Sequence, residues 1–301
     1  MRKVEWSLVF FTLFAQVAIG LFLILVVYQF FQQEGANSTA LADFRSMSFL
    51  IIDLLLVTAV LAATYHLDRP INAYLAMANL KKSWLSREML LGLLFGCILS
   101  ILSLLSWLEI YSPLILSILL IAGSVVGIAL LYAISRIYML RTVPTWNSII
   151  VPFSFFGTSI LLGSLLFGIT VVIQPPSLHS SGDLSTMLDQ LLDGISTGSV
   201  TLMFIQILLS YLILKRHRVQ TLAIDSSFDY TWTRYRLLFL LRLGSGLIGI
   251  TLYINFLYPF IGNYQAEGPW GLLLIVSFLM VFLSETCGRI LFYASYKIAG
   301  I

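Results

Sequence analysis

Eight long runs of apolar residues, separated by short polar breaks, dominate this chain of 301 residues. Each run is long enough, at about 17 to 25 residues, to cross the hydrocarbon core of a bilayer as a helix. The runs lie approximately at 6–31, 46–66, 88–108, 113–138, 149–173, 195–214, 237–257 and 270–292. The pattern predicts an all-α integral membrane protein, with eight transmembrane helices in a single polytopic domain over residues 1–301.

The composition strengthens this prediction. Hydrophobic residues make up 59% of the chain and charged residues 10%, whereas soluble domains carry about 25% charged residues. Continuous apolar runs, rather than weakly alternating segments of about ten residues, exclude an outer-membrane barrel. The first run is also longer than the core of a secretory signal, about 7 to 15 residues, so we interpret it as an uncleaved first span.

The distribution of positive charge predicts an orientation. Eight spans place both termini on one side of the membrane, together with the loops after the second, fourth and sixth helices. Of the 17 Lys and Arg residues, only Arg45 falls on the opposite side. The others are Arg2, Lys3, Arg69, Lys81, Lys82, Arg87, Arg136, Arg141, Lys215, Arg216, Arg218, Arg234, Arg236, Arg242, Arg289 and Lys297. Positive residues stay in the cytoplasm, so we expect a multi-pass inner-membrane protein with both termini cytoplasmic.

A weak internal echo links the two halves of the sequence. Trp6 and Gly20 in the first run have loose counterparts in Trp146 and Gly163 near the fifth, and long basic loops follow the second and sixth runs. This fits two parallel four-helix halves. Aromatic residues and glycine are common in membrane helices, so a chance echo stays open.

The densest polar interval is residues 64–90. His66 closes the second apolar run and Glu88 opens the third, so both side chains can lie at one depth of a helical hairpin. Imidazole and carboxylate groups are suitable proton acceptors for quinol oxidation, and Arg69 and Arg87 are available to keep the carboxylate charged. The structural alternative is that these residues anchor helix ends at the headgroups, where a glutamate suits a helix N-terminus.

Other polar residues stand near or inside the spans. Glu285 and Arg289 are four positions apart in the last helix, so they share a face and can pair, either as helix–helix contacts or beside a quinone pocket. Further candidates for docking or helix packing are Arg136, Arg141, Trp146, Asp53 and Gln16.

Ligands for a metal or haem are scarce. Cys97 and Cys287 stand alone, without the CxxC spacing of iron–sulfur or zinc sites, and we expect both as buried thiols. Of the three histidines, His179 and His217 fall in loops, so no pair shares a buried depth for haem. We therefore expect no haem, no iron–sulfur cluster and no metal in this protein. Nucleic-acid binding is not expected either: the basic segment 215–236 suits anionic lipids or a partner protein.

Several motifs resemble those of a known family. They are His66-Leu67-Asp68-Arg69-Pro70, Ser83-Trp84-Leu85-Ser86-Arg87-Glu88, Thr142-Val143-Pro144-Thr145-Trp146-Asn147-Ser148, and Glu285 with Gly288-Arg289. Together they resemble the dimethyl sulfoxide reductase membrane anchor subunit family (DmsC), and the resemblance runs through most of the sequence.

The resemblance implies eight helices and a menaquinol-oxidising anchor without haem. It also implies an iron–sulfur partner subunit that receives the electrons and a molybdopterin catalytic subunit. The family's quinol-site residues correspond to His66 and Glu88. Neighbouring residues expected to bind or tune the quinol are Tyr65, Arg69, Trp84 and Arg87.

Two questions stay open at this point. In several family members the catalytic subunits are exported, which would place the docking face outside, whereas the charge distribution here places the His66 face inside. The alternatives to a quinol-oxidising anchor are a secondary transporter and a structural anchor without a quinol site. A transporter is the weaker of these, because transporters place polar residues and broken helices near the bilayer midplane.

Overall fold

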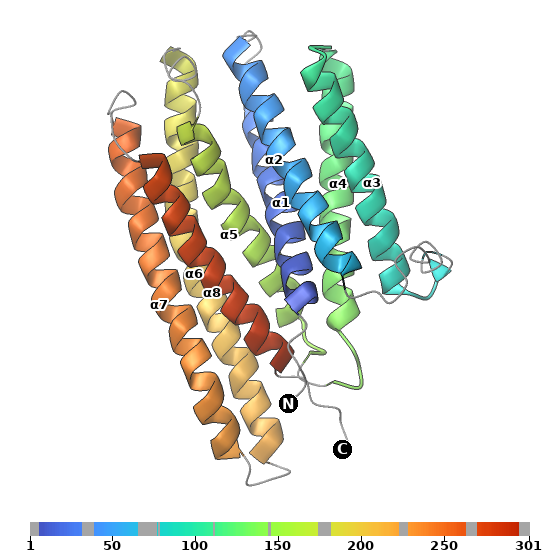
Figure 1. Cartoon of the computed structure of the whole chain (residues 1–301), viewed down its shortest axis with the longest axis vertical. Coiled ribbons are helices and arrows are strands. Elements are labelled where there is room, and N and C mark those ends of the chain that lie inside the picture. The colour runs from blue at the N-terminus through green and yellow to red at the C-terminus, as the bar shows by residue number, and fades with distance from the viewer. Residues whose placement is uncertain are drawn as a thin grey trace.

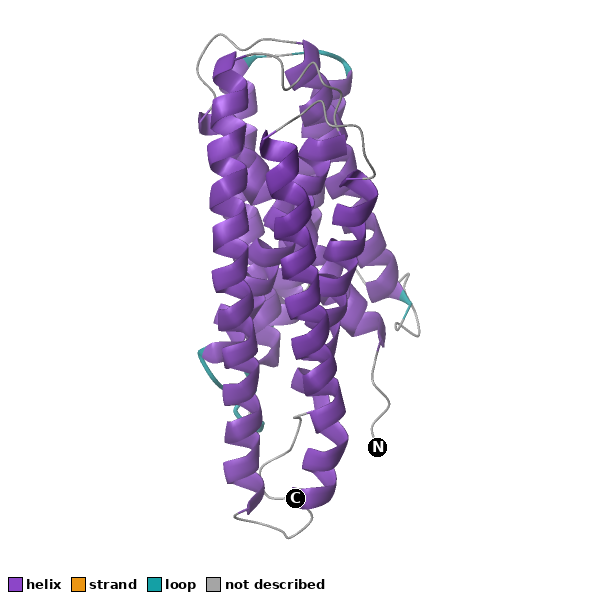
Figure 2. Ribbon diagram, turned by 90° about the vertical axis from the view of Figure 1, so that its left-hand side faces the viewer, coloured by secondary structure: helices purple, strands orange, loops and turns teal. Residues whose placement is uncertain are grey.

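The computed structural model describes residues 6–31, 39–65, 77, 79–110, 112–143, 146–173, 182–222, 228–262 and 270–294. The described residues form eight helices and no strand, arranged as an elongated bundle (Figures 1 and 2). The helices are α1 (Trp6–Phe31), α2 (Thr39–Thr64), α3 (Trp84–Trp107), α4 (Pro113–Tyr138), α5 (Ile150–Ile173), α6 (Gly182–Leu222), α7 (Phe228–Gly262) and α8 (Trp270–Ala294). All eight are long and apolar enough to cross a membrane, which confirms the predicted fold class.

The helices form two groups of four. In each group successive helices pack together and the last helix returns to the first, so α4 contacts α1 and α8 contacts α5. Between the groups α1 packs along α5, with smaller contacts of α1 with α8 and of α4 with α5. The contacts of α1 with α4 and of α1 with α8 thus correspond to those of α5 with α8 and of α5 with α4, whereas the contact of α6 with α8 has no counterpart of similar size between α2 and α4.

The central helices are α1 and α5, which lie between α3–α4 on one side and α6–α7 on the other (Figure 1). In their apolar windows 72% of residues are buried inside the protein, against 22% in α2 and α3. The core of the bundle is consequently the seam between the two groups.

Glycine allows α1 and α5 to approach closely. A Cβ atom added to Gly163 would meet the backbone of Gly20 and Leu21, and one added to Gly20 would meet the carbonyl of Ser159. Small residues are the usual means by which membrane helices bring their backbones together. Hydrogen bonds reinforce the crossing: Ser159 Oγ donates to the Gln16 carbonyl at 2.7 Å.

Several helix ends differ from the predicted ones. The largest differences are in α6 and α7, predicted at 195–214 and 237–257, because the helical backbone continues through polar flanks beyond the apolar run. With 41 residues, α6 is about 60 Å long, roughly twice the hydrocarbon thickness. The length of an apolar run thus predicts the length of the membrane-spanning part of a helix. It does not predict the length of the whole helix.

The hairpin between α2 and α3 also differs. The second helix ends at Thr64 rather than 66, and the third begins at Trp84 rather than 88. Ser83 is the N-cap of α3, and its side chain accepts a hydrogen bond from the Ser86 amide at 3.2 Å, a typical cap arrangement. Glu88 therefore lies in the second turn of α3, inside the helix. This hairpin lies at the end of the bundle where α1 begins and α8 ends (Figure 1). We call this end of the bundle the terminal end.

Candidate functional site

Glu88 is the sequence-predicted residue that the structure places most distinctively. Its side chain is 7% exposed, within a helix that has the length and composition of a membrane span. Among the described residues no side chain or backbone group makes a hydrogen bond or ion pair with its carboxylate. A buried carboxylate in this state is an acceptor without a donor.

The structure describes only some of the residues that were predicted to surround Glu88. His66 and Arg69 lie outside the described residues. Tyr65 follows the last turn of α2, and its side chain is 91% exposed. Arg87 donates from Nε to the Leu80 carbonyl and from Nη2 to the Lys81 carbonyl, both at 2.8 Å. Arg87 thus binds the segment entering α3 and makes no ion pair with Glu88.

The Trp84 ring lies close to two guanidinium groups. The Arg87 guanidinium is 4.3 Å from the ring centroid and that of Arg136 is 5.3 Å away, both within range of a cation–π attraction. The Trp84 ring also meets Tyr132 of α4 edge-on, with centroids 5.6 Å apart. Trp84 therefore joins the start of α3 to the end of α4, beside Glu88.

A cluster of aromatic side chains lies at the terminal end, where α4 and α8 end. The hydroxyl of Tyr293 on α8 donates to that of Tyr138 on α4 at 2.8 Å. Trp146 stacks on Phe292 with centroids 5.0 Å apart, and its Nε1 donates to the Phe292 carbonyl at 3.0 Å. Trp146 is therefore buried and structural, whereas Arg141, the other candidate after α4, is exposed.

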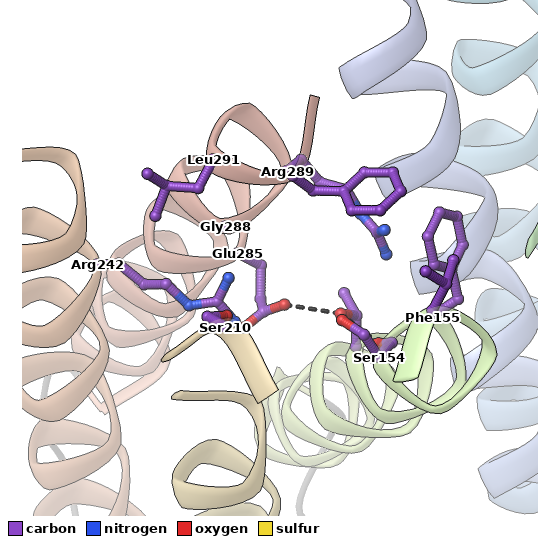
Figure 3. A pocket seen from close by; sticks show the side chains of 11 residues that line it. Ser154, Phe155, Ser210, Arg242, Glu285, Gly288, Arg289 and Leu291 are labelled. Atoms are coloured by element: carbon purple, nitrogen blue, oxygen red, sulfur yellow. Dashed lines mark hydrogen bonds and ion pairs between the residues drawn. The ribbon is translucent and has the colours of Figure 1, made fainter. Parts of the chain in front are cut away.

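A second polar centre lies between α5, α6, α7 and α8. Arg242 Nη2 on α7 pairs with Glu285 Oε1 on α8 at 3.0 Å, and both side chains are almost fully buried. The other carboxylate oxygen accepts from Thr158 Oγ1 at 2.7 Å. Figure 3 shows the Glu285 carboxylate between the side chains of Arg242 and Arg289.

The predicted pairing of Glu285 with Arg289 is wrong. Glu285 is paired with Arg242 instead, and Arg289 Nη2 donates to Gln16 Oε1 on α1 at 2.8 Å. The Arg289 guanidinium also lies 3.5 Å from the ring centroid of Phe155. Although Glu285 and Arg289 are four positions apart on α8, Glu285 contacts α7 and Arg289 contacts α1. Both contacts are possible because α8 packs against α7 and also against α1 and α5.

This second centre encloses a small cavity (Figure 3). Its volume is about 20 Å³, which is room for a water molecule and too little for a quinone ring. The residues around it include Ser154, Phe155, Thr158, Ser210, Arg242, Glu285 and Arg289. The arrangement is therefore a closed charge network that joins helices.

Two further expectations can be compared with the structure. Asp53 on α2 accepts a hydrogen bond from Ser103 on α3, and both line a groove of about 630 Å³ between these helices, away from the terminal end. Cys287 is buried as expected, but Cys97 is exposed. Among the described residues no group of three or more His, Cys, Asp and Glu side chains is placed to hold a metal ion.

Sequence reasoning misses several of these residues. The charge distribution alone assigns Arg242 to the loop charges, yet it lies inside the apolar span of α7 and is 3% exposed. Its sequence context, Leu240-Leu241-Arg242-Leu243, is the available signal. Tyr138 and Tyr293 give no such signal, because tyrosine is ordinary at membrane interfaces.

Comparisons with known proteins identify the family of this protein. Residues 1–295 match the family described as DMSO reductase anchor subunit (DmsC). The sequence is similar to the C subunit of the anaerobic dimethyl sulfoxide reductase of Haemophilus influenzae, with 26% identity over 297 residues, covering 99% of this protein and 96% of the relative. It is also similar to the subunit of the same name in Escherichia coli, with 27% identity over 302 residues and the same coverage. This protein belongs to the DMSO reductase anchor subunit family.

Proposed function

We propose that this anchor subunit binds and oxidises menaquinol at its terminal end and passes the electrons to a docked iron–sulfur subunit. The observation that carries the proposal is Glu88, a buried carboxylate that has no hydrogen-bonding partner among the described residues. Ionisable groups inside a membrane segment are energetically costly and usually serve a function. A quinol hydroxyl is a donor of the kind that this carboxylate lacks.

The α2–α3 pairing places the end of α2 at the level of Glu88. Asp53 bonds to Ser103, and Gly96 lies against Leu56. Continuing this antiparallel register puts Thr64, where α2 ends, level with residues 88 to 92. His66 itself lies outside the described residues, two positions further along the sequence. In the proposal its imidazole accepts one quinol proton, and Glu88 accepts the other.

The partners follow from the electron balance. Oxidation of one quinol releases two protons and two electrons, and the described residues of this protein include no cluster of metal ligands that would store electrons. The anchor role of the family implies catalytic and electron-transfer partners. In the proposal these are an iron–sulfur subunit docked on the terminal end and a molybdopterin subunit beyond it. Dimethyl sulfoxide is the terminal acceptor named for the similar proteins.

The orientation is part of the proposal. In the proposal the terminal end, with both termini, faces the cytoplasm, and the bias of Lys and Arg towards that end supports this orientation. Arg242 and Arg289 are buried within spans and do not count as loop charges, but the remaining loop residues keep the same bias. Quinol oxidation would then release protons and deliver electrons on the cytoplasmic side.

Substitution of Glu88 tests the proposal. In the assembled, membrane-bound complex, we expect E88Q and His66→Ala each to lower the rate of re-oxidation of a short-chain menaquinol analogue at least tenfold. Removing one general base typically costs 10² to 10⁴ in rate. Glu109→Gln is the matched control, because Glu109 is exposed and follows α3 at its other end. Normal quinol oxidation by both assembled variants would instead indicate a structural anchor without a quinol site.

A further inference from the structure

We propose that the terminal end carries a binding site for an anionic phospholipid, in which Arg87 and Arg136 hold the headgroup phosphate where the start of α3 meets the end of α4. The site consists of four cations, Lys81, Lys82, Arg87 and Arg136, and a stripe of exposed apolar side chains on α4. The inference concerns a different ligand from the quinol and does not rest on the proposed function.

The two guanidinium groups are close neighbours. Both guanidinium carbons lie within 5.3 Å of the centroid of the Trp84 ring. Like charges at so short a separation repel each other, and among the described residues no carboxylate pairs with Arg87 or Arg136. An anion that contacts both side chains would relieve this repulsion.

Both side chains have donors to spare. Arg87 uses Nε and Nη2 for the carbonyls of Leu80 and Lys81, which orients its guanidinium group and leaves Nη1 without a partner among the described residues. Arg136 donates from Nη1 to the thioether sulfur of Met139 at 3.4 Å, a weak acceptor. Phosphate oxygens are among the strongest acceptors for guanidinium groups, so a phosphate supplies the acceptor that both arginines lack.

The turn before α3 adds positive potential at the same place. Lys81 and Lys82 are exposed in this turn, and the two hydrogen bonds from Arg87 hold the turn against the helix. The N-terminus of α3, a helix of 24 residues, contributes the positive end of its dipole. The neighbouring carboxylate, Glu88, is buried and makes no ion pair with Arg87. The accessible charge of this surface is therefore positive, as an anionic headgroup requires.

The outer face of α4 provides a surface for the acyl chains. Ile121, Val125, Ile128 and Tyr132 are each between 43% and 63% exposed, and their spacing of three and four positions puts them on one face of the helix. Arg136 is the next member of this series. From Ile121 to Arg136 the stripe is about 22 Å long, more than half of the hydrocarbon thickness of about 30 Å. The stripe can therefore cover the acyl chains of one leaflet.

The position of Arg136 favours a lipid over a soluble partner protein. Arg136 lies within the α4 span, two positions before its end at Tyr138, and α3 and α4 lie at one edge of the bundle (Figure 1). Trp84 and Tyr132, whose rings meet edge-on, are residue types that gather at the level of the headgroups. A soluble protein can cover the loops of the terminal end but cannot follow the apolar stripe into the bilayer, whereas a phospholipid contacts both.

Lipid titration of the purified full-length protein tests the site. The delipidated protein in detergent is titrated with phosphatidylglycerol or with phosphatidylcholine of the same acyl chains, and the rise in the midpoint of thermal unfolding gives an apparent Kd. We expect phosphatidylglycerol to bind about tenfold more tightly or better, since each cation near an anionic headgroup contributes about a fivefold gain in affinity.

Two variants and a control locate the effect. Arg136→Gln removes one charge-assisted contact and should weaken phosphatidylglycerol binding about tenfold. Lys81→Gln combined with Lys82→Gln should weaken it by a similar factor. Arg236→Gln is the matched control, because Arg236 is an exposed arginine at the start of the α7 span, in the other helix group. Its apparent Kd should change less than about twofold.

Each outcome supports or overturns the inference. The lysine variant reports on the site even where Arg136→Gln fails to fold, because both lysines are exposed. Equal affinity for the two lipids would overturn the inference, and so would equal losses in Arg136→Gln and Arg236→Gln, which would indicate a diffuse surface charge. Unchanged lipid binding in Arg136→Gln, together with loss of a co-purifying partner subunit, would make this surface a protein contact instead. None of these measurements uses quinol oxidation, so a negative result leaves the proposed function unaffected.

Discussion

Arg289 of the last helix donates a hydrogen bond to the side-chain oxygen of Gln16 in the first helix, 273 positions earlier in the sequence, at 2.8 Å. The amide nitrogen of Gln16 donates to the Phe155 carbonyl on α5, also at 2.8 Å. One amide side chain thus satisfies groups on two other helices at the seam between the helix groups. This explains a glutamine inside an otherwise apolar span.

Replacement of Gln16 should therefore destabilise the fold. In Gln16→Leu the buried Arg289 guanidinium loses its hydrogen-bond acceptor, and leaving a buried donor unsatisfied costs about 1 to 3 kcal/mol, or more when the donor is charged. We expect a clearly lower midpoint of thermal unfolding for the detergent-solubilised protein. Gln16→Glu, which keeps an acceptor for Arg289, should lose less. A Gln16→Leu protein as stable as the unmodified one would contradict this account.

The pair Arg242–Glu285 should behave as a unit. Arg242→Met or Glu285→Leu alone leaves one buried charge without its partner, at a cost of about 3 to 5 kcal/mol. The double variant removes both charges, so we expect it to be more stable than either single variant. Thermal unfolding of the four proteins measures the coupling. A double variant whose loss equals the sum of the single losses would show that the two residues are independent.

The crossing of α1 and α5 should not tolerate a larger residue. Gly163→Ala places a Cβ against the backbone of Gly20 and Leu21, so the helices must separate. We expect lower yield of folded protein and a lower unfolding midpoint, with a loss of about 1 to 3 kcal/mol. Gly92→Ala is the matched control on α3, because nothing lies within 4 Å of its added Cβ. Equal behaviour of the two variants would contradict the proposed close approach.

Reporter fusions test the orientation. A reporter that is active only outside the cytoplasm should be active when fused at residues 177–181, before α6, and inactive when fused at residues 70–76, after α2. The charge bias is the reason. The reverse pattern would place the quinol site and the docked subunits on the exported side.

The general architecture was predictable because transmembrane helices appear in the sequence as continuous apolar runs. The run at 113–138, for example, has the bounds of α4. The end of α6 was not predictable in this way, since its polar turns continue a helix outside the hydrocarbon core, where apolar character is not needed.

The site was predictable in part. Glu88 could be selected as a candidate because a carboxylate between apolar runs is rare, and the structure shows that it is buried. The partner of Glu285 could not be found from spacing, because a helical face shows which residues share a side but not which neighbouring helix covers it. Tyr138 lies on α4 in the first helix group and Tyr293 on α8 in the second. Their hydroxyls meet only because the two groups pack together, which the sequence does not show.

The position of α1 at the seam has a consequence for biogenesis. The ribosome delivers α1 first, but the acceptor for the Gln16 amide is the Phe155 carbonyl, 139 positions later. Until α5 has been synthesised, α1, one of the two most buried helices, lies in the membrane with its Gln16 amide unpaired and Gly20 exposed to lipid. The packing of the first helix group is therefore complete only after α5 has entered the bilayer.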